Sequence, residues 1–282
     1  MDETTIAGLN AVRTGSGPPM LLLHGIGHRW QMWLPVIDSL ARDFEVVAVD
    51  LPGFGRSPRI PDGVDPGLDV AADQLEGVLD ELGWAQAHVV GNSLGGWLAL
   101  ELARRGRVLS VTGLAPAGLW SDRAAIDRRL RFWFTLWVTG ARRSTPAMTR
   151  LLRFRLVRAL VLYRLFGRPW RIPGDVAIGD ARALADSAFD QVFNAEPGRS
   201  FTGGQAIEAP ITVTWHSRDP LFDPRHCTTG ELPPHTRVLV LHGCGHVPTW
   251  DDPPLVLETI RATVAASLTP AVTSAPHVAE AV

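Results

Sequence analysis

The chain has 282 residues, of which 46% are hydrophobic and 20% are charged, proportions typical of soluble globular proteins. Its formal net charge of −2 gives no overall attraction to polyanions, so we expect no nucleic-acid partner. With only Cys227 and Cys244, a disulfide scaffold is excluded, and two free thiols are favoured over a single bridge between them.

The first residues, Met1-Asp2-Glu3, are acidic and are not followed by the apolar run of a secretion signal. No stretch approaches the ~18 uninterrupted apolar residues of a membrane-spanning helix. We therefore expect a cytoplasmic protein without firm membrane association.

Short apolar segments alternate with helical patterns through the first 117 residues. Strands are predicted at residues 20–23, 45–49, 87–90 and 108–114. Helices are predicted between them, notably at residues 68–82 and 94–104. Short strands that alternate with helices require right-handed crossovers. The pattern therefore predicts an α/β fold with a mainly parallel sheet covered by helices on both faces.

The alternation stops after residue 117, and residues 119–204 show helical periodicity without a convincing strand. Four apolar residues fall at i, i+3, i+4 and i+7, on one helix face: Leu130, Trp133, Phe134 and Trp137. Strand patterns resume at 211–216 and 237–241, and a closing helix is predicted at 254–268. We therefore predict a core of residues 1–117 and 206–267, an inserted all-helical cap of residues 118–205, and a loose tail of residues 268–282.

The most specific signal is the G-x-S-x-G sequence of residues 91–95, directly after a predicted strand and directly before a predicted helix. A turn this tight leaves room only for small neighbours, which Gly91 and Gly95 provide. Ser93 is thereby placed at the carboxyl end of the sheet, near the positive end of the following helix. This context predicts a nucleophilic serine rather than an ordinary glycine-rich turn.

A serine hydroxyl needs a base to remove its proton, and the base needs an acid to orient it. His246 follows the last predicted strand in a glycine-containing loop that can curl back toward Ser93, whereas His242 lies at the strand end, where the loop has no slack. Asp219, just beyond the strand at 211–216, is the favoured acid, and Asp223 is the alternative. Three earlier histidines are expected to be structural or to line the pocket: His24, His28 and His216.

An acyl-transfer site also needs N–H donors for the oxyanion. The backbone N–H of Leu94, the residue after the nucleophile, is one candidate. Loop position assigns the second donor to Ile26, which follows an early strand.

Four motifs in order resemble those of the α/β-hydrolase superfamily, in the branch of small serine hydrolases with a helical cap. They are residues 24–27 (HGIG), 50–57 (DLPGFGRS), 91–96 (GNSLGG) and 245–248 (GHVP). The resemblance covers roughly residues 10–117 and 206–267, and it implies an eight-stranded, mostly parallel sheet. Members with Asp at the nucleophile position are dehalogenases and epoxide hydrolases, so Ser93 argues against both activities.

Residues 122–171 contain thirteen arginines and two acidic residues. Most of these arginines are expected on the solvated outer faces of amphipathic helices, although one can instead grip an acidic substrate group or an anionic membrane surface. The predicted substrate-binding residues are Trp133 and Trp137, on the apolar stripe, and Trp30, after the oxyanion loop. The same side chains would also serve simply to pack the cap onto the core.

The sequence has no cluster of metal ligands and no dinucleotide-binding glycine motif, so neither a metal nor a cofactor is expected. We predict a serine hydrolase that cleaves a carboxylic ester or lactone of a small to medium, mainly apolar molecule through an acyl-enzyme. Its activity should fall on acidification as His246 becomes protonated. Alternatives on the same triad are an acyltransferase, a natural-product tailoring enzyme and a carbon–carbon bond hydrolase, although Val247 stands where the last usually has Trp. From another class, a small-ligand receptor can keep the same triad.

Overall fold

The computed structural model describes residues 1–61, 63–121, 123–195 and 199–268. Eight strands form one sheet in the order β1-β2-β4-β3-β5-β6-β7-β8. The strands are β1 (Glu3–Ile6), β2 (Leu9–Thr14), β3 (Pro19–Leu23), β4 (Glu45–Val49), β5 (Ala87–Asn92), β6 (Val108–Leu114), β7 (Ile211–His216) and β8 (Arg237–Leu241). All neighbouring strands from β4 to β8 pair in parallel, and β1 and β2 add an antiparallel edge.

Helices cover the sheet on both faces, as expected. They are α1 (Leu34–Leu40), α2 (Leu68–Glu81), α3 (Leu94–Arg104) and α9 (Pro253–Leu268), with the short 3₁₀ turns η1 (Trp30–Trp33) and η4 (Pro224–His226). Because side chains alternate along a strand, Leu21 and Leu23 pack in the cluster that contains α2 and α3, whereas Met20 and Leu22 pack with α1 and α9. The central strands are therefore buried on both faces.

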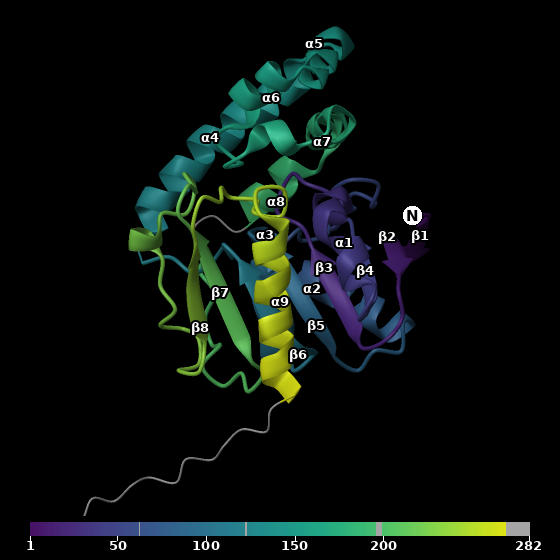
Figure 1. Cartoon of the computed structure of the whole chain (residues 1–282), viewed down its shortest axis with the longest axis vertical. Helices are drawn as coiled ribbons and strands as arrows, with labels where there is room; N and C mark the ends of the chain where they lie inside the picture. Colours follow the sequence, from purple (N-terminus) through teal and green to yellow (C-terminus); the bar gives the residue numbers. More distant parts are fainter. Residues whose placement is uncertain (62, 122, 196–198, 269–282) are drawn as a thin grey trace, which may run out of the picture.

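The segment between β6 and β7 is helical. It contains α4 (Arg123–Arg143), α5 (Pro146–Arg150), η2 (Leu151–Arg153), α6 (Arg155–Leu162), η3 (Pro169–Arg171), α7 (Gly174–Asp186) and α8 (Phe189–Ala195). Figure 1 shows α4, α5 and α6 as an arm that projects away from the sheet, with α5 at its far end. Within its described residues, this segment has no strand beyond an isolated bridge between Trp120 and Cys227.

Specific contacts join the helical segment to the sheet layers. Leu130 and Phe134 of α4 are buried in the same cluster as α2 and α3. Arg29 forms an ion pair with Asp180 of α7, with 2.7 Å between its Nε and the carboxylate. These contacts place α4 and α7 over the loops at the carboxyl ends of the strands, where the predicted nucleophile lies.

The structure agrees with some of the smaller expectations and differs from others. The sequence pattern does not locate the antiparallel strands β1 and β2 individually, because both mix polar and apolar residues and lack the continuous apolar run of the central strands. Cys227 and Cys244 are free thiols. The division into core and cap remains a prediction, and all but the first residue of the predicted tail lies outside the described residues.

Candidate active site

Ser93 occupies the turn between β5 and α3 in a backbone conformation that is rare for a residue with a side chain. Its φ of 53° and ψ of −114° lie outside the helix and strand regions. The neighbouring glycines make this turn feasible: a Cβ on Gly91 would overlap the Gly95 carbonyl, and a Cβ on Gly95 would overlap the Leu23 carbonyl. The surrounding packing therefore holds the Ser93 side chain at the end of the sheet.

His246 and Asp219 form a buried pair. The His246 Nδ1 donates a hydrogen bond of 2.7 Å to Asp219 Oδ2. The other oxygen of this carboxylate accepts from the backbone N–H groups of Leu221, at 2.8 Å, and Phe222, at 3.2 Å. Both Asp219 oxygens are thus held in place, so the acid fixes the imidazole orientation and leaves Nε2 free to act as a base.

Burial alone would raise the pKa of Asp219. The adjacent His246 imidazole and the backbone donor outweigh burial and hold this pKa below its ordinary value. The carboxylate is therefore ionised at neutral pH, which suits it to stabilise a protonated His246 during proton transfer.

Asn92 ties the histidine loop to the serine turn. Its side-chain Nδ2 donates to the carbonyl oxygens of Leu114 and His246, each at 2.9 Å. Because Asn92 immediately precedes Ser93, this bond holds the loop of residue 246 next to the serine turn. His216 supports the same loop, since its Nδ1 donates to the Gly245 carbonyl at 2.7 Å.

The loop of residues 24–27, which is predicted to supply an oxyanion donor, lies against Ser93. A Cβ on Gly25 would stand 3.2 Å from the Ser93 Cβ, so this loop packs as closely as a glycine allows. His24 braces the loop from within: its Nδ1 donates to the Gly25 carbonyl, and its Nε2 accepts from the N–H of Leu51 at 2.8 Å. Ile26 and Leu94, the predicted donors, both line the cavity that contains Ser93.

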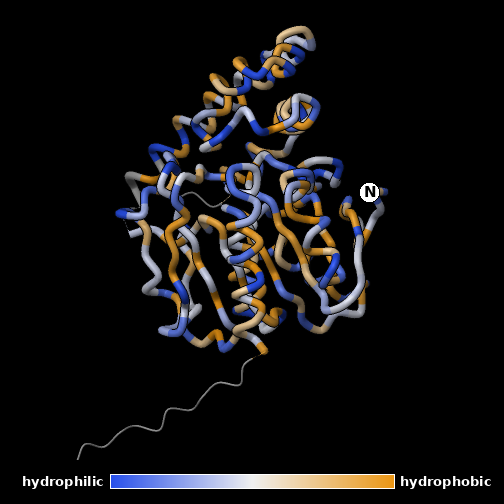
Figure 2. The backbone as a smooth tube through the Cα atoms, viewed as in Figure 1, coloured by the Kyte–Doolittle hydropathy of each residue, from blue (hydrophilic) through white to orange (hydrophobic). Residues whose placement is uncertain are grey.

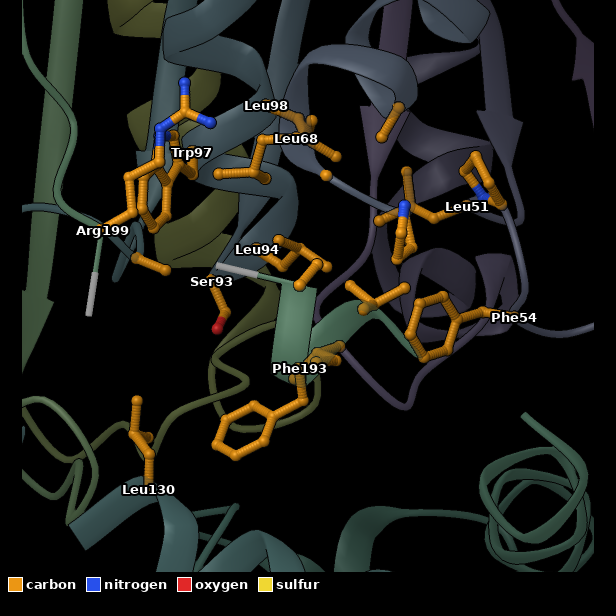
Figure 3. A pocket seen from close by; sticks show the side chains of 18 of the residues that line it. Leu51, Phe54, Leu68, Ser93, Leu94, Trp97, Leu98, Leu130, Phe193 and Arg199 are labelled. Carbon is orange, nitrogen blue, oxygen red and sulfur yellow. The ribbon is translucent and has the colours of Figure 1, made fainter. Parts of the chain in front are cut away.

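Two cavities meet at Ser93. The smaller, of about 120 Å³, lies toward α2 and α3 and is mainly apolar, although Ser93 and Arg199 also line it. Figure 3 shows the Ser93 hydroxyl pointing into this cavity, with Leu130 and Phe193 on the far side. The larger, of about 540 Å³, lies beneath the helical segment and is lined by both Ser93 and His246. A bound molecule can therefore extend from Ser93 in two directions.

Comparison with known proteins decides the family. A family model of the alpha/beta hydrolase fold matches residues 18–253. This chain belongs to the alpha/beta hydrolase family.

Relatives in the family differ in the activities that their names record. The chain is 36% identical over 200 residues to the epoxide hydrolase EphH of Mycobacterium tuberculosis, covering 68% of this chain and 92% of the relative. A membrane phospholipase A of known structure is 25% identical, with a TM-score of 0.74 and coverage of 95% and 86%. The naproxen esterase of Bacillus subtilis shares the fold, with a TM-score of 0.74 at 21% identity and coverage of 93% and 90%.

The alternative triad residues of this alpha/beta hydrolase lie apart from the buried pair. Asp223 bonds to Arg225, with 2.6 Å between its carboxylate and Nη2, and this hydrogen bond lowers the pKa of the carboxyl to about 2. His242 is exposed to solvent. Among the described residues, neither Asp223 nor His242 forms a hydrogen bond with His246 or Asp219.

The three predicted substrate-binding tryptophans have different positions. Trp137 lines the larger cavity. Trp30 is buried in the cluster around α1 and α9, and its Nε1 donates to Glu3 at 3.0 Å. Trp133 packs against Trp137 and lies under the Arg164 guanidinium. Neither Trp30 nor Trp133 is among the described residues that line the two cavities. The η1 turn directs Trp30, and the α4 stripe directs Trp133, into packing contacts with other side chains.

His28, which was expected either to be structural or to line the pocket, is a polar group in the wall of the larger cavity. Its Nδ1 is buried and has no hydrogen-bond partner among the described residues. Burial lowers the pKa of His28, and the nearby Asp180 only partly offsets this. The ring is therefore neutral and can exchange a hydrogen bond with a polar substrate group.

The described residues offer neither a metal-binding cluster nor a membrane-spanning helix. They contain no group of three or more His, Cys, Asp or Glu side chains arranged to hold a metal ion. None of the helices in this part of the chain combines the length and the hydropathy needed to cross a bilayer.

Proposed function

We propose that this alpha/beta hydrolase cleaves carboxylic esters or lactones of small to medium, mainly apolar molecules through an acyl-enzyme on Ser93. The observation that carries the proposal is the buried 2.7 Å bond between His246 and Asp219, on a loop that Asn92 bonds to the serine turn. The apolar lining of both cavities supports an apolar substrate.

In the proposed mechanism, the Ser93 oxygen attacks the carbonyl carbon while His246 Nε2 takes its proton. The N–H groups of Ile26 and Leu94 stabilise the oxyanion. Collapse of the tetrahedral intermediate breaks the bond to the leaving oxygen, which receives the proton from His246. Water, deprotonated by His246, then attacks the acyl-enzyme and releases the acid. Asp219 stays ionised throughout and orients the imidazole.

The relative named as an epoxide hydrolase makes epoxide opening the second candidate. Chemistry at Ser93 disfavours it. A carboxylate that opens an epoxide forms an ester, which water can cleave, whereas a serine oxygen would form an ether. An ether has no carbonyl for water to attack, so the enzyme would be trapped after one turnover.

The two cavities suggest how an ester is oriented. His246 must protonate the leaving oxygen, and it lines only the larger cavity. We therefore place the alcohol portion in the larger cavity and the acyl chain in the smaller one, against α2 and α3. Ala181 lines the larger cavity and Ala71 the smaller, so Phe at each position should shorten only the alcohol or only the acyl group that is accepted.

The main test compares the parent enzyme with Ser93→Ala on p-nitrophenyl esters, lactones and a terminal epoxide. We expect multiple turnovers on esters or lactones by the parent, none by the variant, and loss of labelling by a fluorophosphonate. Labelling that persists in Ser93→Ala would place the nucleophile elsewhere. Binding of these compounds without turnover would favour a receptor, and sustained epoxide turnover would overturn the ester proposal.

A further inference from the structure

The helical arm carries an unusual share of exposed apolar side chains. Ten of the fifteen large apolar side chains that are exposed in the described part of the chain lie between residues 132 and 170. We call these ten the distal surface: Phe132, Leu136, Met148, Leu151, Phe154, Leu156, Leu160, Val161, Tyr163 and Trp170. Leu156 and Leu160 of α6 are the most exposed, at 79% and 75%. Soluble monomers rarely leave such a group uncovered without a binding role.

Nine of the ten side chains of the distal surface lie in or directly beside α4, α5 and α6, on the arm that projects away from the sheet. The tenth, Trp170 in η3, lies closer to the sheet, because the neighbouring Arg171 donates to the Asp251 carbonyl. Figure 1 shows α4, α5 and α6 on this arm, and Figure 2 shows hydrophobic and hydrophilic residues alternating closely along it. The C-terminal end of α9 lies at the opposite end of the molecule. The arm can therefore meet a flat surface without interference from the core.

Positive charge accompanies the apolar side chains. Residues 122–171 have thirteen arginines and two acids. Seven of these arginines are exposed and form no ion pair with a described residue: Arg128, Arg129, Arg143, Arg150, Arg153, Arg155 and Arg171. One of them, Arg153, lies over the Phe154 ring at 4.7 Å, so a positive charge stands directly beside an exposed aromatic side chain.

This combination selects one kind of partner. A second copy of the chain would bring arginines against arginines, which costs free energy unless acids intervene. A bilayer with anionic phospholipids satisfies both features, because guanidinium groups bind the phosphates while Leu, Phe, Tyr and Trp side chains enter the boundary with the acyl chains.

The distal surface is continuous with the substrate cavity. Leu136, Met148, Leu151 and Val161 are about half exposed, and each also lines the larger cavity beside Ser93 and His246. The cavity therefore opens among the exposed apolar side chains. An apolar molecule that leaves a bilayer there can enter the cavity without crossing water.

We propose that the distal surface docks this hydrolase on an anionic phospholipid bilayer, with the mouth of the larger cavity turned toward the lipid. Docking depends only on the surface. Direct uptake of an ester from the bilayer rests in addition on the proposed function.

The test is co-sedimentation with phosphatidylglycerol–phosphatidylcholine vesicles, compared with pure phosphatidylcholine, in a Ser93→Ala background that prevents hydrolysis. We expect binding to the anionic vesicles only. Leu156→Ser/Leu160→Ser should weaken it at least about tenfold through lost apolar contact. Arg150→Gln/Arg155→Gln should weaken it about 25-fold, with a shallower dependence on salt.

Leu268→Ser is the matched control, since Leu268 is 78% exposed at the end of α9 and should leave vesicle binding unchanged. Neither Leu156 nor Leu160 lines a cavity, so their variants, made in the active enzyme, should keep full turnover of a soluble ester and thereby show that they are folded. Equal binding by both cap variants and the parent, or equal loss in Leu268→Ser, would overturn the proposal. So would a parent dimer that the leucine variant converts to a monomer, because the surface would then bind a second copy. Absence of esterase activity would leave docking intact and remove only the uptake step.

Discussion

Replacing Asp219 with Asn tests the proposed triad most directly. The carboxylate accepts three hydrogen bonds, one from His246 Nδ1 and two from the backbone of residues 221 and 222. An amide has only one acceptor oxygen, and the two backbone donors hold that oxygen on their side. The amide NH₂ therefore faces His246 and forces the ring into the tautomer with its hydrogen on Nε2.

A ring with hydrogen on Nε2 cannot take the proton of Ser93. We expect kcat to fall by about 10⁴, the size of loss found for the same change in a serine protease, and equivalent to about 5 kcal/mol in the activation free energy. KM should change little, because Asp219 does not line either cavity among the described residues. The rate of fluorophosphonate labelling should fall in the same proportion, since labelling needs the same base.

The assay measures kcat and KM on the best ester for the parent, Asp219→Asn and the control Asp223→Asn. Asp223 bonds to Arg225 at the surface, so its variant should keep activity within about twofold. Thermal melting confirms that both variants are folded. If Asp219→Asn keeps more than about a tenth of the activity, or if Asp223→Asn loses most of it, the assignment of the acid is wrong.

Two further predictions concern stability. Burial lowers the pKa of both His24 and His216 to about 4, below the ~6.5 of an unfolded chain, so the unfolded state binds more protons in this window. The free energy of unfolding should therefore fall as pH drops from about 6.5 to 4, by about 2 kcal/mol per histidine at pH 5. Urea titrations at pH 7 and pH 5 measure this change. Equal free energies of unfolding at the two pH values would refute the prediction. Gly95→Ala should lower the free energy of unfolding by about 3 kcal/mol, because the added Cβ overlaps the Leu23 carbonyl. Gly140→Ala is the matched variant inside α4, where the added Cβ meets open space, and it should raise the free energy of unfolding by about 0.5–1 kcal/mol. Similar melting temperatures for the two glycine variants would contradict the packing argument.

Local patterns allowed much of the fold and the proposed site to be predicted. The strand–turn–helix context of residues 91–95 located Ser93, because the required glycines and the order of elements are encoded in adjacent residues. The glycine-containing loop after β8 pointed to His246 for the same reason. Strand and helix periodicity likewise predicted the parallel sheet and the helical segment between β6 and β7.

Contacts between distant parts of the chain could not be read from such patterns. The bond from Asn92 to the His246 carbonyl joins residues 154 apart, and no local signal marks it. Trp30 is expected near the substrate, yet its indole donates to Glu3. The sequence gives only the place of Trp30 along the chain, whereas packing around α1 decides where its side chain points. The sequence left open whether His28 is structural or lines the pocket, and only the fold places it in the wall of the larger cavity.

By itself, the sequence determined the family, the serine turn of residues 91–95 and the order of elements, since these depend on residues that are neighbours in the chain. Only the tertiary structure decided that Asp219 rather than Asp223 meets His246, that two cavities meet at Ser93, and that the apolar side chains of α6 face outward. Each of these depends on which surfaces pack together in space, and an apolar helix face reads the same in the sequence whether it is buried or exposed.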